Sequence, residues 1–363
     1  MKVLLTGGGT GGHVYPALSV AEVLPERAGG EQIEFLFVGT TRGDVERLVT
    51  RAGMAFTSVD AAPVRGRGPI ALIRAVWRIS AGFVQSWRIL GKFRPGVVLA
   101  TGGYASVPVS VAAWLRRIPL VVYLPDVYPG LAVRLLVRLA RRVATTTDGA
   151  KEYLPPSKTV VTGYPVRAEF WSQNRNAARR RFGFDEKTPV LLVTGATQGS
   201  MALNTAVIDA LPRLLCDCAI LHQTGLSGIG AARAAAARLP SESRERYQPI
   251  AYLDDMAAAM AAADLAVMRS GASSLAEPPA AGLPAILVPG SFAGAHQRHN
   301  ASYMASRGAA VILAEKRLCE LGDLAVTLLT DKDRLANMKA AATALARPDA
   351  ALRIADVVLE AVA

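Results

Sequence analysis

The chain has 363 residues, of which 51% are hydrophobic and 6% aromatic, and it carries a formal net charge of +12. This length is sufficient for two domains, and the composition is that of a large α/β protein. The three cysteines make neither a disulfide framework nor a CxxC pair, and no run of 18 uncharged apolar residues predicts a membrane span. Because the first predicted strand begins at residue 3, we expect no targeting segment. The cysteine usage fits a reducing cytosol.

The positive charge lies almost entirely in the first half of the chain. Residues 1–165 contain 20 Lys and Arg against 10 Asp and Glu, a net of +10, whereas the remainder has a net of +2. A basic face of this kind attracts phosphates, anionic lipid or nucleic acid. No aromatic-rich basic motif of a nucleic-acid module occurs, so we expect no nucleic-acid partner. A solvated basic surface without a ligand is the alternative.

The first strand, Val3–Leu5, leads into five glycines within Gly7–Gly12, then into His13 and a periodic helical stretch from Pro16 to Leu24. A Gly-rich turn lets the backbone approach a ligand, and the following helix N-terminus presents free N–H groups to an anion. The expected ligand is therefore a phosphate or a pyrophosphate. A turn that only packs the helix against the sheet is the alternative.

The spacing of Gly7, Gly9 and Gly12 formally matches the dinucleotide fingerprint. An NAD site also needs an acidic residue at the end of the second strand to hold the ribose. The second predicted strand, Ile33–Val38, ends in Gly39–Arg42 and has no Asp or Glu at its tip. We therefore exclude NAD and retain a phosphate at the first turn.

The rest of the first half alternates between helices and strands, which predicts an α/β architecture with a parallel sheet. A second Gly turn, Thr101–Tyr104, follows the strand Pro95–Ala100. The segment from Pro155 to Arg167 is expected to be a linker. The other expected elements are Val45–Ala52, Phe56–Val59, Ile70–Leu90, Val107–Leu115, Pro119–Leu124, Leu131–Arg142 and Val143–Thr146.

After the linker the same pattern restarts with the strand Pro189–Val193 and the Gly turn Gly195–Ser200. Two Rossmann-like domains in tandem would place the loops at their strand carboxyl ends face to face across a cleft. Gly turns on both sides predict two phosphate-bearing substrates. The remaining expected elements are Leu203–Leu215, Ala219–His222, Ile250–Leu253, Met256–Ala263, Leu265–Met268, Ser273–Ala281 and Ala285–Val288.

Seven motifs in order along the chain resemble the bacterial lipid I N-acetylglucosaminyltransferases, the MurG family of glycosyltransferase family 28. They are GGGTGGHVYPALSVAEVL, ATGGYASVPVSVAAW, GYPVR, GATQGS, AYLDDMAAAMAAADLAVMRSGASSLAE, PPAAGLPAILVP and HQRHNA. The resemblance implies a GT-B fold with an acceptor- and membrane-facing domain at 1–160, a UDP-GlcNAc-binding domain at 161–345, and a helix at 346–363 that packs back on the first domain.

The resemblance also implies the reaction and its partners. GlcNAc would pass with inversion from UDP-GlcNAc to the 4-hydroxyl of MurNAc in undecaprenyl-pyrophosphoryl-MurNAc-pentapeptide, without a cofactor or metal, giving lipid II for peptidoglycan synthesis. The enzyme would be peripheral, on the cytoplasmic face of the cell membrane, where an anionic surface attracts the basic first half. The amphipathic stretch Ile70–Leu90 would contact this surface, with a core helix as the alternative.

His13 is the candidate general base, since histidine titrates near neutral pH and the turn would place it at the cleft. A histidine that only binds a phosphate or caps the loop is the alternative. By resemblance, Arg65, Gly66, Gly102, Gly103 and Tyr104 bind the acceptor.

The family pattern implies a larger set of donor contacts. Glu277 would accept from the ribose hydroxyls, with a surface or capping carboxylate as the alternative. Arg167 would stabilise the leaving diphosphate. The other expected donor residues are Thr10, Gly11, Gly12, Asp126, Thr197, Gln198, Leu253, Met256, Ala272, Ser273, Ser274, His296 and Gln297.

The chain departs from the family pattern at Tyr123–Asp126, where a His-Glu-Gln-Asn run is usual, at Tyr164, where Asn is common, and at Ala295, where an acidic residue often precedes the histidine. These departures leave open a different lipid acceptor such as diacylglycerol. A UDP-GlcNAc 2-epimerase and a nucleotide-sugar-binding partner without catalysis are further alternatives. Asp331–Asp333 resembles a metal-binding DxD motif, but we interpret it as a solvated turn.

Overall fold

The computed structural model describes residues 1–8, 11–41, 45–62, 69–195, 199–290 and 295–362, with only the backbone described at Gly11, residues 69–76 and Ala295. The chain divides into two units. Unit 1 comprises Met1–Val166 and Arg347–Ala363, and unit 2 comprises Arg167–Ala346. The expected domain ranges differ from these units by a few residues.

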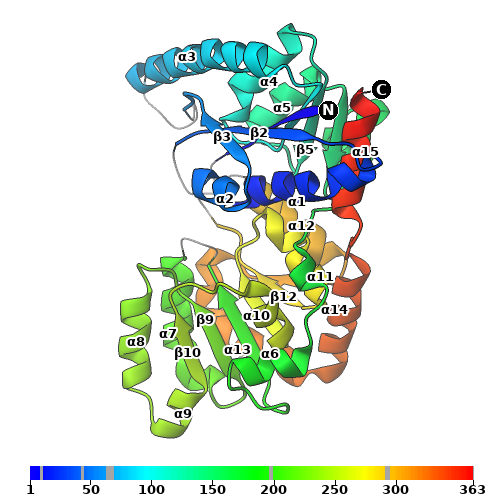
Figure 1. Cartoon of the computed structure of the whole chain (residues 1–363). Coiled ribbons are helices and arrows are strands. Elements are labelled where there is room, and N and C mark those ends of the chain that lie inside the picture. The colour runs from blue at the N-terminus through cyan, green and yellow to red at the C-terminus, as the bar shows by residue number, and fades with distance from the viewer. Residues whose placement is uncertain (9–10, 42–44, 63–68, 196–198, 291–294, 363) are drawn as a thin grey trace. The chain divides into compact units, whose positions relative to one another are not determined.

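Unit 1 is built on a parallel sheet with the strand order β3-β2-β1-β4-β5-β6-β7 (Figure 1). Its central strands are continuous apolar runs, and β5 is buried along its whole length, as expected where helices cover both faces of a parallel sheet. The strands are β1 (Lys2–Thr6), β2 (Glu34–Gly39), β3 (Ala55–Ser58), β4 (Val97–Ala100), β5 (Leu120–Leu124), β6 (Arg142–Thr145) and β7 (Thr159–Val161).

Six α-helices are described in unit 1, and the last of them comes from the end of the chain. Helix α15 packs against α1, beside which it lies in Figure 1. The Arg27 guanidinium of α1 binds the Asp356 carboxylate of α15 at 2.5 Å. The helices are α1 (Gly11–Arg27), α2 (Val45–Arg51), α3 (Pro69–Phe93), α4 (Ser106–Leu115), α5 (Leu131–Leu139) and α15 (Ala350–Val362).

Unit 2 repeats this topology, with the parallel strand order β10-β9-β8-β11-β12-β13. Its strands are β8 (Val190–Thr194), β9 (Ala219–Gln223), β10 (Tyr247–Ile250), β11 (Leu265–Met268), β12 (Ala285–Leu287) and β13 (Ala310–Ile312). Its α-helices are α6 (Arg175–Arg181), α7 (Met201–Leu214), α8 (Ile229–Ala237), α9 (Ser241–Glu245), α10 (Met256–Ala262), α11 (Glu277–Ala281), α12 (Ala295–Ser306), α13 (Leu321–Thr330) and α14 (Lys332–Ala344).

The prediction of a linker from Pro155 to Arg167 is wrong in its middle part. Pro156–Lys158 forms a 3₁₀ turn, and β7 then pairs with β6 at the edge of the first sheet. The strand was missed because β7 has only three residues and follows closely on the proline pair Pro155–Pro156, which predicted a linker. Its pairing with β6 is tertiary information that no local pattern contains.

The strand predicted at Ile250–Leu253 begins earlier, at Tyr247, and ends at Ile250. Pro249 lies within this strand, and β10 is an edge strand, where a missing N–H is tolerated.

The single helix predicted at Ser273–Ala281 is instead a 3₁₀ turn, Ala272–Leu275, followed by α11. Ala276 separates them with φ −141° and ψ −39°. Pro278 and Pro279 explain the break, because they donate no N–H and cannot continue a preceding turn.

The predicted turn at Asp331–Asp333 is in fact the start of α14. The exposed Asp331 is the N-cap residue, and its carboxylate accepts the Arg334 N–H at 3.0 Å.

Candidate functional site

Each unit has a point where the strand order reverses, and in unit 1 this point lies between β1 and β4. Ligands of open α/β sheets bind outside the carboxyl ends of the strands at such switch points. The β1 end continues through Gly7 and Gly8 to α1, and the β4 end continues into Thr101–Tyr104. The two Gly turns singled out from the sequence therefore belong to neighbouring strands.

His13 and Thr101 hold each other across this switch point through two hydrogen bonds. The imidazole Nδ1 lies 2.7 Å from the Thr101 carbonyl oxygen, and the Thr101 hydroxyl donates to the His13 carbonyl at 2.6 Å. Since a carbonyl only accepts, Nδ1 carries the proton in this arrangement. Nε2 of the neutral ring is then the nitrogen that can accept a proton.

Two glycines make this close approach possible. A Cβ at Gly7 would lie 2.2 Å from the Thr101 hydroxyl oxygen, so any larger residue would push the two strand ends apart. Gly102 has φ +98°, and a Cβ there would lie 3.2 Å from Cε1 of His13. The imidazole thus rests on a backbone surface that only glycine provides.

The other predicted residues of unit 1 fall into two groups. Gly103 and Tyr104 follow Gly102 in the second turn and are half-buried, as are Gly12 beside His13 and Asp126 after β5. Thr10, Arg65 and Gly66 lie outside the described residues, and Gly11 is described only as the first residue of α1.

In unit 2 the switch point lies between β8 and β11, and a side chain not predicted from the sequence spans it. Arg269, directly after β11, donates to the Ser200 hydroxyl at 2.6 Å and to the Glu315 carboxylate at 2.5 Å. Ser200 in turn caps α7. The position of an arginine directly after a buried strand could have indicated this role, but its partners lie 69 and 46 residues away.

Three predicted donor residues come together in unit 2. Ser273 donates a hydrogen bond to the half-buried Glu277, and the positive charge of Arg167 also acts on this carboxyl. Burial dominates and raises the pKa of Glu277 to about 7, against the lowering effects of Arg167 and Ser273. Glu277 therefore lies near the ends of the strands where ligands bind. Because its pKa is close to neutral, additional hydrogen-bond donors would readily favour its ionised form.

The remaining predicted donor residues of unit 2 surround the same edge of the sheet. Leu253 is buried in the loop after β10, and Met256 begins α10. Ala272 and Ser274 belong to the 3₁₀ turn after β11. His296 and Gln297 lie in the first turn of α12, where the Gln297 amide oxygen accepts the Gly290 N–H at 2.8 Å. Thr197 and Gln198 lie outside the described residues.

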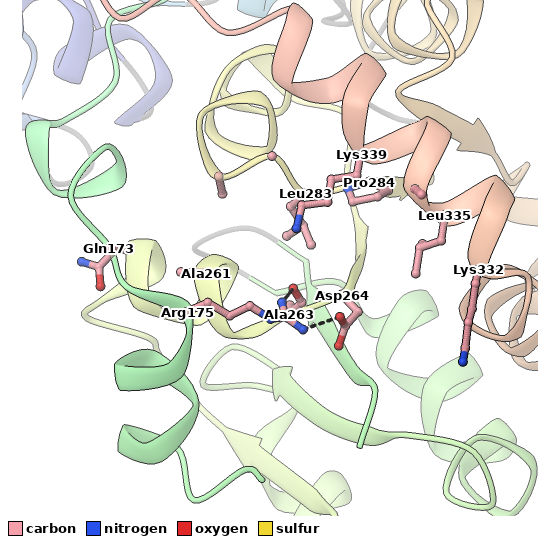
Figure 2. Close-up of a pocket in the computed structure, with 13 residues that line it drawn as sticks. Gln173, Arg175, Ala261, Ala263, Asp264, Leu283, Pro284, Lys332, Leu335 and Lys339 are labelled. Atoms are coloured by element: carbon pink, nitrogen blue, oxygen red, sulfur yellow. Dashed lines mark hydrogen bonds and ion pairs between the residues drawn. The ribbon is translucent and has the colours of Figure 1, made fainter. Parts of the chain in front are cut away.

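A hollow of about 300 Å³ lies at the opposite, amino edge of the unit 2 sheet (Figure 2). Arg175 and Asp264 form an ion pair in it, and Lys332 and Lys339 of α14 line its side. Asp264 precedes β11, so this hollow is separated from the switch point by the length of the strand. It contains none of the residues predicted to bind the donor.

Unit 1 exposes three tryptophans on the packed helices α3 and α4, and one of them contacts an arginine. The exposed fractions are 74% for Trp77, 39% for Trp87 and 50% for Trp114. The Arg116 guanidinium lies over the Trp87 ring, 4.1 Å from its centroid. We call these four residues the Trp–Arg surface. Among the described helices, none is both long enough and apolar enough to span a bilayer.

Metal ligands do not gather at either switch point within the described part of the chain, where no group of three His, Cys, Asp or Glu side chains could hold an ion.

Comparison with known proteins relates both units to one family. Residues 3–145 match the glycosyltransferase family 28 N-terminal domain, and residues 190–354 match the C-terminal domain of the same family. The chain is 39% identical to a UDP-N-acetylglucosamine–N-acetylmuramyl-(pentapeptide) pyrophosphoryl-undecaprenol N-acetylglucosamine transferase from Roseiflexus sp., over 98% of this chain and 94% of the relative. It is 38% identical to the protein of that name from Moorella thermoacetica, over 100% and 99% of the two chains.

Among solved structures, the fold is similar to that of Acinetobacter baumannii MurG. The TM-score is 0.77 at 26% sequence identity, and the match covers 99% of both chains.

Proposed function

Because the chain belongs to glycosyltransferase family 28, we propose that it transfers GlcNAc from UDP-GlcNAc to the MurNAc of undecaprenyl-pyrophosphoryl-MurNAc-pentapeptide, the step that forms lipid II in peptidoglycan synthesis. The observation that carries this proposal is the match over nearly the full length of relatives that bear this activity in their name. Both switch points of the GT-B fold fall within the matched residues.

His13 is the general base in this proposal. With Nδ1–H donated to the Thr101 carbonyl, Nε2 accepts the proton of the MurNAc 4-hydroxyl as its oxygen attacks the anomeric carbon of GlcNAc. The attack comes from the face opposite to UDP, and the bond between that carbon and the UDP oxygen breaks, so the configuration inverts and UDP leaves. We assign Gly102, Gly103 and Tyr104 to acceptor binding, and the family pattern adds Arg65 and Gly66 to this set.

Unit 2 holds the donor. Glu277 accepts from the ribose hydroxyls, and Arg167 neutralises charge on the departing diphosphate. Leu253 and Met256 contact the uracil, and His296 and Gln297 the GlcNAc hydroxyls. We assign Thr10, Gly11, Gly12, Asp126, Thr197, Gln198, Ala272, Ser273 and Ser274 to the same donor complex. The transfer proceeds without a cofactor or a metal, since cationic and N–H donors supply the charge stabilisation.

The enzyme acts at the cytoplasmic face of the cell membrane, where its lipid-linked acceptor is anchored. The Trp–Arg surface supports this location, because tryptophans next to arginines are suited to an anionic lipid interface. The net charge of +10 over residues 1–165 acts in the same direction. Nucleic acid has no part in this function.

UDP release from UDP-GlcNAc, measured with EDTA throughout, tests the proposal. We expect release with a short-chain lipid I analogue, none with diacylglycerol, and a product heavier by one GlcNAc in mass spectrometry. UDP release with diacylglycerol but not with the lipid I analogue would show that the enzyme uses another class of acceptor. Conversion of UDP-GlcNAc to its 2-epimer without any acceptor would instead indicate an epimerase.

A further inference from the structure

A proline in helix α1 leaves the turn that carries His13 without one of its hydrogen bonds. Pro16 lies inside α1 and has no N–H. In a regular helix, residue 16 would donate to the carbonyl of Gly12, four residues earlier. The Gly12 carbonyl, directly before His13, must therefore find its donor elsewhere.

Tyr164 supplies a donor to this carbonyl. Its side chain is 4% exposed, and its hydroxyl donates to the Gly12 carbonyl oxygen at 3.3 Å. The two residues are 152 positions apart in the chain. A side chain from the segment after β7 thus supplies the hydrogen bond to Gly12 that Pro16 cannot donate.

A second tyrosine supports Tyr164 from the sheet side. The Tyr123 ring is fully buried in β5, with its centroid 6.4 Å from that of Tyr164. Its hydroxyl donates to the carbonyl of Gly163 at 3.1 Å and lies 2.8 Å from the Thr146 hydroxyl. Two positions at which this chain departs from the family pattern are therefore packed against each other.

We propose that Tyr164 is a positioning residue for the transfer reaction. Its hydroxyl replaces the hydrogen bond that Pro16 cannot donate and holds the first turn of α1 where His13 meets the Thr101 carbonyl. Tyr164 touches no substrate in this proposal and acts only through Gly12 and His13. The inference rests on the proposed function of His13 as the base.

The first test removes the hydroxyl alone. Tyr164→Phe keeps the ring packed on Tyr123, and we expect kcat to fall about five- to tenfold, the effect of one neutral hydrogen bond. The KM for UDP-GlcNAc should stay within twofold, because the donor contacts of unit 2 are unchanged. Tyr247→Phe is the matched control, since it removes another buried hydroxyl, which contacts His222 in unit 2 at 2.9 Å. It should leave kcat within twofold. An unchanged kcat in Tyr164→Phe overturns the proposal.

The second test restores the missing helical donor. Pro16→Ala returns an N–H to position 16, so the Tyr164 hydroxyl should become dispensable. We expect Tyr164→Phe to lower kcat less than twofold in the Pro16→Ala background. An equal loss in both backgrounds overturns the proposal, because the hydroxyl would then act elsewhere.

A third readout separates this inference from the proposed reaction. The chain has four histidines, so the ¹⁵N signals of their side chains can be assigned with single variants. We expect the Nδ1–H form of His13 in the wild type and a mixed population in Tyr164→Phe, whereas Tyr247→Phe should affect only His222. Wild type that lacks acceptor-dependent UDP release would contradict the proposed function alone. An unaltered His13 signal in folded Tyr164→Phe would contradict the inference alone.

Discussion

The two switch points share one strand order but hold their central side chains differently. In unit 1, half-buried His13 is fixed by a backbone carbonyl, and within the described part of the chain its other ring nitrogen has no hydrogen-bond partner. In unit 2, Arg269 is 15% exposed and its guanidinium is occupied by Ser200 and Glu315. One topology therefore places differently partnered side chains at the two switch points, and we propose that this difference makes His13 the reacting residue while Arg269 supports the fold.

The largest expected effect is on turnover, and it comes from removing the imidazole of His13. His13→Ala should lower turnover about 10²- to 10⁴-fold, the range for loss of a general base. The affinity for UDP-GlcNAc should change less than threefold, because its main contacts are assigned to unit 2. Steady-state UDP release and calorimetric donor binding on the same preparation measure both quantities. Unchanged turnover would remove His13 from the mechanism.

A methyl group at Gly7 should disrupt the His13–Thr101 contact without replacing either of these two residues. Because its Cβ would lie 2.2 Å from the Thr101 hydroxyl oxygen, Gly7→Ala should lower kcat about tenfold or more and reduce the melting temperature. Gly130→Ala is the control, since its Cβ would meet nothing within 4 Å. Equal activity of the two variants would show that the close approach of the strand ends is not required.

Breaking the half-buried Arg269–Glu315 pair in unit 2 should affect stability rather than chemistry. Arg269→Met removes an ion pair whose side chains are only 15% and 26% exposed, and should lower the free energy of unfolding by about 2–3 kcal/mol. Arg317→Met breaks an exposed pair with Glu320, at 61% and 45% exposure, and should lower it by less than about 1 kcal/mol. Denaturant unfolding of both variants measures the difference. Equal losses would contradict a special role for Arg269.

The smallest effect is a pH dependence of donor binding. Burial raises the pKa of Glu277 to about 7, whereas ribose hydroxyls favour its ionised form. Binding below this pH must release a proton, so the affinity for UDP should fall about tenfold from pH 8 to pH 6. Glu277→Gln should bind more weakly and lose this dependence. Wild-type affinity that is constant over this range would show that Glu277 does not contact the donor as an anion.

The sequence predicted both Gly turns at the switch point of unit 1, because buried strands and glycine runs are local signals. The short strand β7 and the shifted strand β10 were not predicted correctly, since pairing at a sheet edge tolerates the prolines before β7 and within β10. The partners of Arg269 and Tyr164 could not be predicted at all. Each contact joins residues far apart in the chain, and only the folded sheet brings them together.

The most direct test of the account is hydrogen–deuterium exchange of the full chain with UDP alone. We expect slower amide exchange in residues 265–281, around the unit 2 switch point, and little change in residues 97–106 of unit 1. This result would place the nucleotide in unit 2 and leave the turn beside His13 for the acceptor. Protection confined to residues 97–106 would contradict this division of the two substrates.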